Sequence, residues 1–449
     1  MRGPMRSPAF AASALILACC RAPAPPTAAQ PLVLEEDGGW CWFQDPRAVV
    51  HGGRVLLGSV AAGRFDPARR GDVQVTTWEL DSGRCSTFEL ADRLELDDHD
   101  APALHLRSDG RWLAMYARHD ADGLVRWRIC ERPGDISSWR PESTLEATVE
   151  GRGVTYSNLQ RARWGDGSEV LLDFFRGDGW DPNLLVSRDE GRSWQLAGRL
   201  LAGPGRPYLR YAGDGEVVHF IASEEHPRDR DSSIWHGILR AGRVCASDGT
   251  PLGAVVEGPV AAAALTLVFE GRPDASTWTA DLELDRGGRP VALFTIQKDG
   301  AGLPPGQGGL DHRLGYARWD GERWRAHEIA CAGTRLYPGE DDYTGLGALD
   351  PDDPSSVYLS TDAHPVSGAP LVSAADGRRH RELFRGVSRD GGESWEWTPL
   401  TADSSADNLR PTVPPRSGGR TALLWLRGEL RSYTDYDLEI VGLALEQTR

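Results

Sequence analysis

Two segments far apart in the chain share one pattern, and this repetition constrains the fold more than any other feature of the sequence. They read SRDEGRSW at 187–194 and SRDGGESW at 388–395, both of the form Ser-x-Asp-x-Gly-x-Ser-Trp. In a tight turn such an aspartate accepts hydrogen bonds from backbone N–H groups, the glycine permits the turn geometry, and the tryptophan packs between strands. The repetition therefore predicts an architecture built from similar units, and it specifies fold rather than chemistry.

Around these two segments the chain consists of many short predicted strands. Apolar runs such as RVLLGSV, EVLLDFFRG and VVHFIAS are bounded by Gly, Asp and Pro, and long amphipathic helical patterns are missing. The 52 glycines, 30 prolines and 16 tryptophans suit tight turns with indole rings packed between sheets. The repeated motif resembles the Asp-box, or BNR repeat, of sialidase-like β-propellers. We therefore predict an all-β chain that forms a single seven-bladed β-propeller over residues 31–449, with about 60 residues per blade.

The N-terminus MRGPMRSPAFAASALILACC has two arginines, a short apolar run and then cysteine, which is the layout of a secretory signal. The apolar run is too short to cross a bilayer. Because Ile16-Leu17-Ala18 precede Cys19 as in a bacterial lipoprotein processing site, we expect a signal peptide over 1–19, lipidation of Cys19 and a Pro/Ala tether over 20–30. Ordinary cleavage near Ala28-Ala29 is the alternative. Either route predicts export, to the bacterial cell envelope or to the medium, with membrane contact only through the lipid.

Charge and composition exclude several classes of function. At a formal net charge of −16 the chain lacks the basic footprint that nucleic acid requires, although arginines can still line a pocket for an anion. Lys298 is the only lysine, which disfavours Schiff-base chemistry. The cysteines show no CxxC spacing, so neither a zinc ribbon nor a disulfide-dense scaffold is expected. A monomer that needs no organic cofactor is predicted, and a structural calcium or zinc ion is left open without a located site.

Two hairpins carry ionisable residues at matching positions. In the first, a turn at 108–110 brings His99 opposite His119. In the second, a turn near 165–168 sets Tyr156 opposite Arg176, and both residues lie 57 positions after their counterparts in the first hairpin. That displacement is close to one predicted blade of about 60 residues. Because equivalent ends of adjacent blades face the same rim of the central channel, we expect these four side chains to converge.

Further candidates for substrate contact lie at or near other strand ends. A third hairpin contributes four of them, and four more follow from the arginines of FQDPR, NLRP and WLRG and the tyrosine of DDYTG. The set is Arg206, Tyr208, Arg210, His226, Arg47, Arg410, Arg427 and Tyr343. Each has a structural alternative, since arginines often tie loops across blades and aromatic residues often pack in turns.

The four converging residues suit the abstraction of a proton beside a carboxylate. An arginine can pair with both oxygens of a uronate carboxylate and stabilise the enolate-like charge that forms when the C5 hydrogen leaves. A neutral histidine or a tyrosine can act as the base, and a tyrosine can return a proton to the departing O4 oxygen. No pair of carboxylates is obviously placed for glycoside hydrolysis. The sequence therefore favours β-elimination over hydrolysis.

Longer motifs extend over the predicted propeller: GGWCWFQDPRAVV at 38–50, DDHDAPAL at 97–104, TYSN at 155–158, FFRG at 174–177, HPR at 226–228, DDYTGLGALDPDDPSSVYLSTD at 341–362 and NLRPTVP at 408–414. Together they resemble the BNR-repeat propeller family that contains the ulvan lyases, which cleave sulfated rhamnose-uronate polysaccharide by β-elimination. The resemblance implies that His99 and Tyr156 take the acid and base positions, that Arg176 neutralises the uronate carboxylate, and that His119 is a second histidine of the pocket. Leu159 departs from the family, where TYSN is commonly followed by proline.

Structural interpretations of the same residues remain open. His99 could cap a turn or hold a calcium ion with the aspartates of 97–100, and the tyrosine could be an ordinary buried ring. Arg176 could be paired with Asp173 or Asp178.

Two other functions are also compatible with the predicted fold. A sialidase would need an arginine triad, for which Arg176, Arg410 and Arg427 are available, but no tyrosine–glutamate pair stands out. A surface lipoprotein that binds an anionic polysaccharide without cleaving it would use the same cleft. Release of sialic acid would indicate the first, and binding without unsaturated product would indicate the second.

Overall fold

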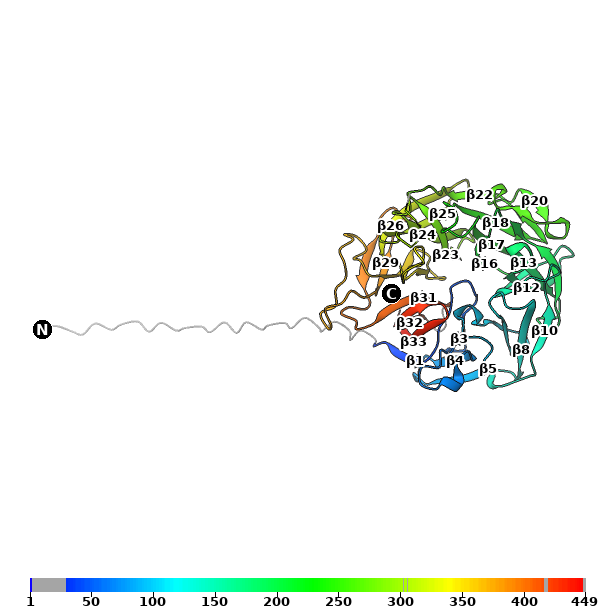
Figure 1. The fold of residues 1–449 in the computed structure, drawn as a ribbon, viewed down its shortest axis with the longest axis horizontal. Helices are drawn as coiled ribbons and strands as arrows, with labels where there is room; N and C mark the ends of the chain where they lie inside the picture. Colours follow the sequence, from blue (N-terminus) through cyan, green and yellow to red (C-terminus); the bar gives the residue numbers. More distant parts are fainter. Residues whose placement is uncertain (2–29, 302, 305, 416–418, 447–449) are drawn as a thin grey trace.

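The computed structural model describes residues 1, 30–301, 303–304, 306–415 and 419–446. Over these residues the chain forms a ring of seven antiparallel sheets about a central axis, and the sheets follow one another in chain order (Figure 1). The predicted all-β, seven-bladed β-propeller is confirmed. The expected signal peptide, Cys19 and nearly all of the tether lie outside the described residues.

Each blade begins with its innermost strand and continues outward. Blade one comprises β2 (Ala48–His51), β3 (Arg54–Val60), β4 (Val73–Glu79) and β5 (Cys85–Ala91). Blade two comprises β6 (Ala103–Leu106), β7 (Trp112–Ala117), β8 (Leu124–Arg132) and β10 (Ser143–Glu146), and β9 (Asp135–Trp139) also pairs with β8. Blade three comprises β11 (Thr155–Arg163), β12 (Glu169–Arg176), β13 (Pro182–Ser187) and β14 (Gln195–Arg199).

Blade four comprises β16 (Tyr208–Gly213), β17 (Val217–Ser223), β18 (Ile234–Arg240), β19 (Arg243–Cys245), β20 (Pro251–Ala254) and β22 (Thr266–Phe269). Blade five comprises β23 (Ser276–Leu284), β24 (Pro290–Gln297), β25 (His312–Trp319) and β26 (Trp324–Gly333). Blade six comprises β27 (Gly347–Leu349), β28 (Ser356–Thr361), β29 (Glu382–Val387) and β30 (Glu396–Pro399). Blade seven comprises β31 (Asp407–Thr412), β32 (Arg420–Ser432), β33 (Asp435–Glu446) and β1 (Leu32–Glu35).

A short parallel pair joins β15 (Leu201–Ala202), which follows blade three in the chain, to β21 (Val260–Ala261), which lies between β20 and β22 of blade four. The helical elements of the described residues are single 3-10 turns: η1 (Pro67–Arg69), η2 (Asp98–Asp100), η3 (Asp178–Trp180), η4 (Val255–Glu257) and η5 (Ala262–Ala264).

The blades stack face to face, and this explains the strand sequences. A middle strand has neighbouring blades on both faces, so every residue of β7 (WLAMYA) and of β24 (PVALFTIQ) is buried. Such strands therefore read as continuous apolar runs, whereas the outermost strand β10 (STLE) has no fully buried residue. The ring is closed by the N-terminal strand, because β1 pairs with β33 in blade seven, with Leu32 opposite Gly442.

Both Asp-box motifs form the turn between the third and fourth strands of a blade. In blade three, Asp189 accepts hydrogen bonds from the Ser193 backbone N–H (2.9 Å) and hydroxyl (2.7 Å), and Gly191 has φ +83°. In blade six, Asp390 accepts the equivalent backbone bond from Ser394 (3.0 Å). The predicted turn chemistry of both motifs is confirmed.

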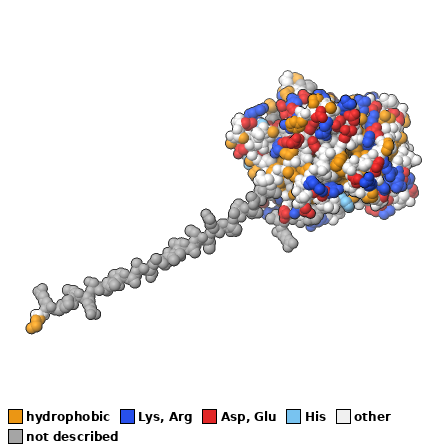
Figure 2. Space-filling model, turned by 90° about the horizontal axis from the view of Figure 1, so that it is seen from below, with side chains coloured by type: hydrophobic (Ala, Val, Ile, Leu, Met, Phe, Trp, Pro, Cys, Tyr) orange, Lys and Arg blue, Asp and Glu red, His pale blue; other side chains and the backbone are white. Residues whose placement is uncertain are grey.

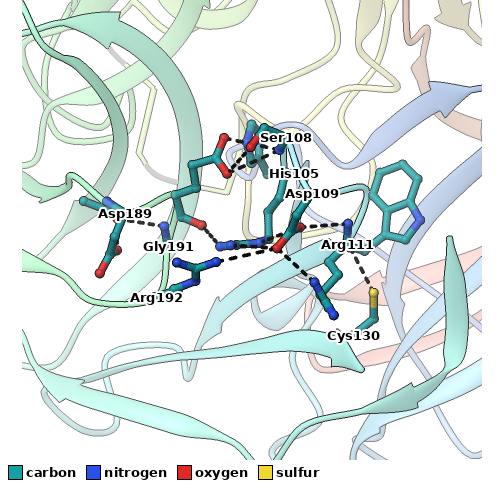
Figure 3. A network of polar contacts seen from close by, with 12 residues as sticks. His105, Ser108, Asp109, Arg111, Cys130, Asp189, Gly191 and Arg192 are labelled. Atoms are coloured by element: carbon teal, nitrogen blue, oxygen red, sulfur yellow. Dashed lines mark hydrogen bonds and ion pairs between the residues drawn. The ribbon is translucent and has the colours of Figure 1, made fainter. Parts of the chain in front are cut away.

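The first Asp-box also joins blade three to blade two (Figure 3). Glu190, which has φ +58°, accepts a hydrogen bond from the Ser108 hydroxyl (2.7 Å) in the β6–β7 turn. Asp109 of that turn pairs with Arg111 (3.1 Å) and lies 3.8 Å from Arg192 of the Asp-box. The motif therefore holds two neighbouring blades together in addition to shaping its own turn.

The axis of the ring is filled by the segment between β1 and β2, residues 38–47, here called the central segment. Its Trp42 donates a hydrogen bond from Nε1 to the Thr279 carbonyl of blade five (3.1 Å), and its Trp40 donates to the Arg410 carbonyl of blade seven (3.3 Å). The Cys41 N–H bonds to the Asp98 carbonyl, which precedes blade two (2.9 Å). Contacts to blades on different sides of the ring place this segment at the centre, where it separates the two ends of the channel.

The propeller surface carries charges of both signs, and Figure 2 shows acidic and basic side chains interspersed on the side that it displays. No helix among the described residues is long and apolar enough to cross a membrane.

Candidate active site

Two histidines lie together at one end of the channel and share a carboxylate. His99 belongs to η2, just before β6, and His119 follows β7, so the observed pairing of Ala103 with Met115 extends to place them opposite each other as predicted. Their rings stack with centroids 4.1 Å apart and an interplanar angle of 18°. Asp97 accepts a hydrogen bond from Nδ1 of His99 (2.6 Å) through one oxygen and from Nδ1 of His119 (2.7 Å) through the other. Both rings are thereby held in fixed orientations.

The surroundings drive the protonation states of the two rings apart. Burial alone would lower the pKa of His99, but Cys41, Asp97 and the Tyr156 hydroxyl act in the opposite direction and raise it well above its usual value. Burial and the charge on His99 lower the pKa of His119 to about 4, against the attraction of Asp97. The pair therefore carries a single positive charge at neutral pH, on His99. Because both Nδ1 atoms donate to Asp97, the neutral ring presents a lone pair at Nε2.

Tyr156 lies beside the histidine pair because of a β-bulge. The predicted pairing of Tyr156 with Arg176 is wrong by one residue: Thr155 is opposite Arg176, and the register shifts between Thr155 and Asn158. Within this bulge Tyr156 has φ +70°, a conformation that costs about 1–3 kcal/mol for a non-glycine residue. The bulge directs the ring toward His99, at a centroid distance of 5.5 Å. Burial raises the pKa of the Tyr156 hydroxyl, so it is protonated at neutral pH.

Arg176 is a buried cation without a carboxylate partner among the described residues. Its side chain donates hydrogen bonds to the Tyr208 hydroxyl (3.3 Å) and the Thr155 hydroxyl (3.2 Å), and its guanidinium lies 5.1 Å from the Tyr156 ring centroid. The alternative ion pairs are not formed. Asp173 accepts a hydrogen bond from the Asn158 N–H, and Asp178 accepts hydrogen bonds from the backbone N–H groups of residues 149 and 150. Arg176 is 8% exposed and free to pair with an anion that enters the site.

Four further predicted residues lie around this cluster. Tyr208, the first residue of β16, packs edge-on against His226 (5.5 Å between centroids), and His226 packs on Trp278 (4.5 Å). Tyr343 is buried against the same indole (5.2 Å) and contributes to the floor beneath the site. Arg206 lies at the more open edge, paired with an exposed aspartate.

Three predicted arginines are instead buried in contacts with residues of the central segment, to which Arg47 itself belongs. Arg47 donates to the Cys41 carbonyl (3.1 Å), and Arg210 pairs with Asp281 (3.0 Å) and with Asp45. Arg210 faces the channel as Tyr208 does, but it lies two residues further along β16, roughly 7 Å toward the opposite end. Arg410 donates to Asp98 (2.5 Å) and to the Trp40 carbonyl, so it supports the loop that carries His99 and lies behind the site.

The last of the predicted arginines, Arg427, forms an ion pair within blade seven rather than a contact with the cluster. Arg427 lies on β32 and pairs with Glu439 of β33 (2.5 Å), an ion pair between neighbouring strands of blade seven. The strand end inferred from WLRG is in fact the middle of a long hairpin, because β32 continues to Ser432.

Residues 65–332, more than half of the chain, match the BNR repeat-containing family. The chain belongs to this family. No curated protein matches the sequence. An ulvan lyase of polysaccharide lyase family 25, solved bound to -[GlcA(1-4)Rha3S]-, is similar in structure with a TM-score of 0.65 at 15% identity, covering 93% of this chain and 96% of that one. The polysaccharide lyase Uly1 has a TM-score of 0.58 at 10% identity, covering 93% and 98%. These structural similarities establish a shared fold.

This member of the BNR repeat-containing family has further site residues that sequence reasoning missed. Tyr433, in the β32–β33 turn, packs edge-on against both histidines, at 5.2 and 5.5 Å between centroids. Asp97 orients both rings, although the sequence suggested it only as a calcium ligand. The run DDHD could have indicated an orienting carboxylate, whereas nothing in RSYTDYD connects Tyr433 with residues of blade two.

In the part of the chain that the structure describes, three groups of side chains have spacings suited to a metal ion: Cys41 with Asp98 and His99, Asp97 with His99 and His119, and His226 with Glu340 and Asp342. In the first two groups the carboxylates already bind Arg410 or the two rings. The third fits a cation better, because one oxygen of Asp342 is buried without a hydrogen-bond partner and burial raises the pKa of this carboxyl to about 7. Its Glu340, however, pairs with Arg228 (2.6 Å).

Proposed function

We propose that the protein is a polysaccharide lyase that cleaves a uronate-containing, sulfated, ulvan-like polysaccharide by β-elimination. One observation carries the proposal: a histidine pair that shares one carboxylate and has one neutral ring lies beside a protonated tyrosine and an arginine that, within the described residues, has no carboxylate partner. This arrangement combines a base, an acid and a binding site for a carboxylate within one pocket.

Arg176 would bind the uronate carboxylate. Removal of the C5 proton places a second negative charge on this group, and a buried guanidinium stabilises that charge more strongly than water does. Because the described residues offer Arg176 hydroxyl groups and no carboxylate, it loses no ion pair to them when the substrate arrives.

The proton transfers would then involve the histidine pair and Tyr156. The neutral ring accepts the C5 proton at Nε2, the C5–H electron pair forms the C4–C5 double bond, and the C4–O4 bond breaks. Tyr156 donates its proton to O4, and the products are an unsaturated sugar and a new chain end. No water is consumed. In this scheme Tyr156 keeps the acid role that the family resemblance implies, and the base is His119 rather than His99, because His119 is the ring that stays neutral.

Structural relatives support the choice of substrate. The family 25 ulvan lyase was solved with an oligosaccharide of glucuronate and 3-sulfated rhamnose, and the two chains are similar over 93% of the present one. At 15% identity this similarity supports the substrate class as a proposal for this chain.

The decisive experiment follows the ultraviolet absorbance of the unsaturated product during incubation with ulvan. Wild-type protein is expected to generate it, and His99→Ala and Arg176→Ala are expected to lose at least about 99% of the rate. His51→Ala, which alters an exposed histidine of blade one, is the matched control and should keep full activity. Saturable binding of ulvan without product would support the non-catalytic glycan-binding alternative, and release of sialic acid would support a sialidase.

We also propose export as a lipoprotein anchored through Cys19, which would bring the propeller to polymers outside the cell. Mass spectrometry of the mature N-terminus tests this, with Cys19→Ala as the variant that should lose the lipid. An unmodified N-terminus near residue 29 would overturn the anchor and leave export intact. A monomeric state, which we likewise propose, is tested by light scattering during gel filtration.

A further inference from the structure

Three arginines surround one indole at the edge of the candidate site. Trp180 lies in η3, in the turn between β12 and β13, and the guanidinium carbons of Arg152, Arg176 and Arg206 lie 5.6, 5.5 and 5.0 Å from its ring centroid. They come from the linker between β10 and β11, from β12 and from the segment before β16, and so from three separate parts of the chain. Such a concentration of cations around one aromatic ring is costly unless an anion is also bound.

Among the described residues only one of these three arginines forms an ion pair. Neither Arg152 nor Arg176 has an ion pair within the described part of the chain. Arg206 pairs with Asp229 at 3.2 Å, but that aspartate is half exposed, and such a pair is weak. At least two positive charges therefore remain available to a ligand.

The backbone holds these side chains in place before any ligand arrives. The Asp178 carboxylate accepts hydrogen bonds from the N–H groups of Val149 (2.7 Å) and Glu150 (2.9 Å), which ties the loop of Arg152 to the turn of Trp180. The Thr148 hydroxyl donates to the Arg152 carbonyl (2.8 Å) and closes that loop. Preorganisation of this kind lowers the entropy cost of binding a ligand.

We propose that Arg152, Trp180 and Arg206 form a clamp for the sulfate ester of the sugar next to the uronate; this inference rests on the proposed lyase function. Arg176 is shared between the two anions, since its guanidinium lies 5.1 Å from the Tyr156 ring centroid and 5.5 Å from that of Trp180. A sulfate ester keeps its charge at every working pH, and its oxygens match the paired N–H groups of guanidinium. The indole face offers an apolar surface for the sugar ring beside it.

The test compares ulvan with chemically desulfated ulvan, which retains its uronate carboxylates. Arg152→Ala and Arg206→Ala are expected to raise KM roughly ten- to hundredfold on ulvan and to leave KM on the desulfated polymer nearly unchanged. Arg152→Lys keeps the positive charge but not the paired N–H groups of guanidinium, so its KM on ulvan should lie between those of wild type and Arg152→Ala. Arg199→Ala is the control, because Arg199 lies next to the same turn but is paired with Asp181 (3.3 Å), and it should change neither KM.

Equal losses on both polymers, or no loss on either, would overturn the clamp. Arg152 is exposed, so Arg152→Ala should keep the wild-type Tm, and a lowered Tm together with equal losses would assign Arg152 a structural role. If the wild-type protein makes no unsaturated product, the proposed function fails separately. The clamp is then tested by calorimetric titration of wild type and Arg152→Ala with each of the two polymers. The clamp requires that wild type binds the sulfated polymer more tightly than the desulfated one and that the variant loses this preference.

Discussion

The two ends of the channel, on either side of the central segment, bury charged side chains in different ways. At the end that carries the histidines, the hydrogen bonds of Arg176 within the described residues go to hydroxyl groups, and its charge is left for a ligand. At the opposite end, Arg210 faces Asp45 and Asp281, so its charge is already neutralised within the protein. That end also has a cavity of about 470 Å³, lined in part by these three residues and Glu283. A buried charge next to a cavity therefore does not by itself identify the functional end of the channel. The functional end is identified by a buried cation without an anionic partner among the described residues, beside side chains that can act as acid and base.

Tyr156→Phe gives the largest expected effect and tests the functional end. It removes only the hydroxyl, and loss of a positioned proton donor costs roughly 10²–10⁴-fold in kcat. Steady-state kinetics on ulvan measure this change, with the Tm expected to stay near that of wild type because the ring still fills its site. Retention of full activity would remove Tyr156 from the mechanism.

Arg210→Ala tests the opposite end. It leaves Asp45 and Asp281 buried without their cation, which is expected to cost about 3–5 kcal/mol of unfolding free energy. Denaturant unfolding measures this loss, and kcat of the protein that remains folded should be unchanged. A variant with wild-type stability and lost activity would reverse the roles that we assign to the two ends.

Asp97→Asn should remove the carboxylate that both histidine rings bind, while an amide of nearly the same size still fills its place. One amide oxygen cannot accept from both rings as the carboxylate does, so we expect a loss of roughly 10- to 100-fold in kcat. The raised pKa of His99 depends on Asp97, so the alkaline limit of activity should also move to lower pH in this variant. A reduced kcat with an unshifted pH profile would mean that Asp97 acts only through packing.

The wild-type pH profile should show a broad plateau. His119 must be neutral, so the rate is expected to rise as pH increases through about 4, its pKa in the folded protein. The rate should fall again only where His99 loses its proton, well above the usual histidine range. Measuring kcat/KM from pH 3 upward gives both limits for the free enzyme. An acid limit near the ordinary histidine pKa of about 6.5 would contradict the proposed difference between the pKa values of His99 and His119.

Glu283→Gln has the smallest expected effect and again tests the opposite end. Burial and the charges of Asp281 and Asp45 raise the pKa of Glu283 well above its usual value. A carboxyl whose pKa is raised on folding contributes fully below its unfolded pKa, and that stability is lost as pH rises through the folded value. The variant should therefore have a Tm a few degrees above wild type at pH 8 and equal to it at pH 4, with kcat unchanged. Thermal unfolding at both pH values measures this difference.

The sequence predicted the architecture and part of the candidate site, for identifiable reasons. The Asp-boxes identified the propeller because their turn chemistry is local. The pairing of His99 with His119 followed from an unbroken hairpin. Tyr156 was placed one residue out of register because a bulge with a left-handed tyrosine has no sequence signature comparable to glycine.

The burial of Arg47, Arg210 and Arg410 could not be predicted because it depends on where the central segment runs. The apolar run Trp-Cys-Trp-Phe at 40–43 indicated a buried segment, but only tertiary structure shows that it occupies the axis. Trp180 and its arginines come together from three loops, and no local pattern links them.

The order β1, central segment, β2 along the chain links closure of the propeller to support of the candidate site. One continuous stretch, residues 32–51, contains both β1, which closes the propeller, and the central segment, which lies beneath the candidate site. Dissociation of β1 from β33 would displace the central segment that contacts the loop of the histidine pair. Loss of activity on heating and opening of the propeller should therefore occur in a single transition.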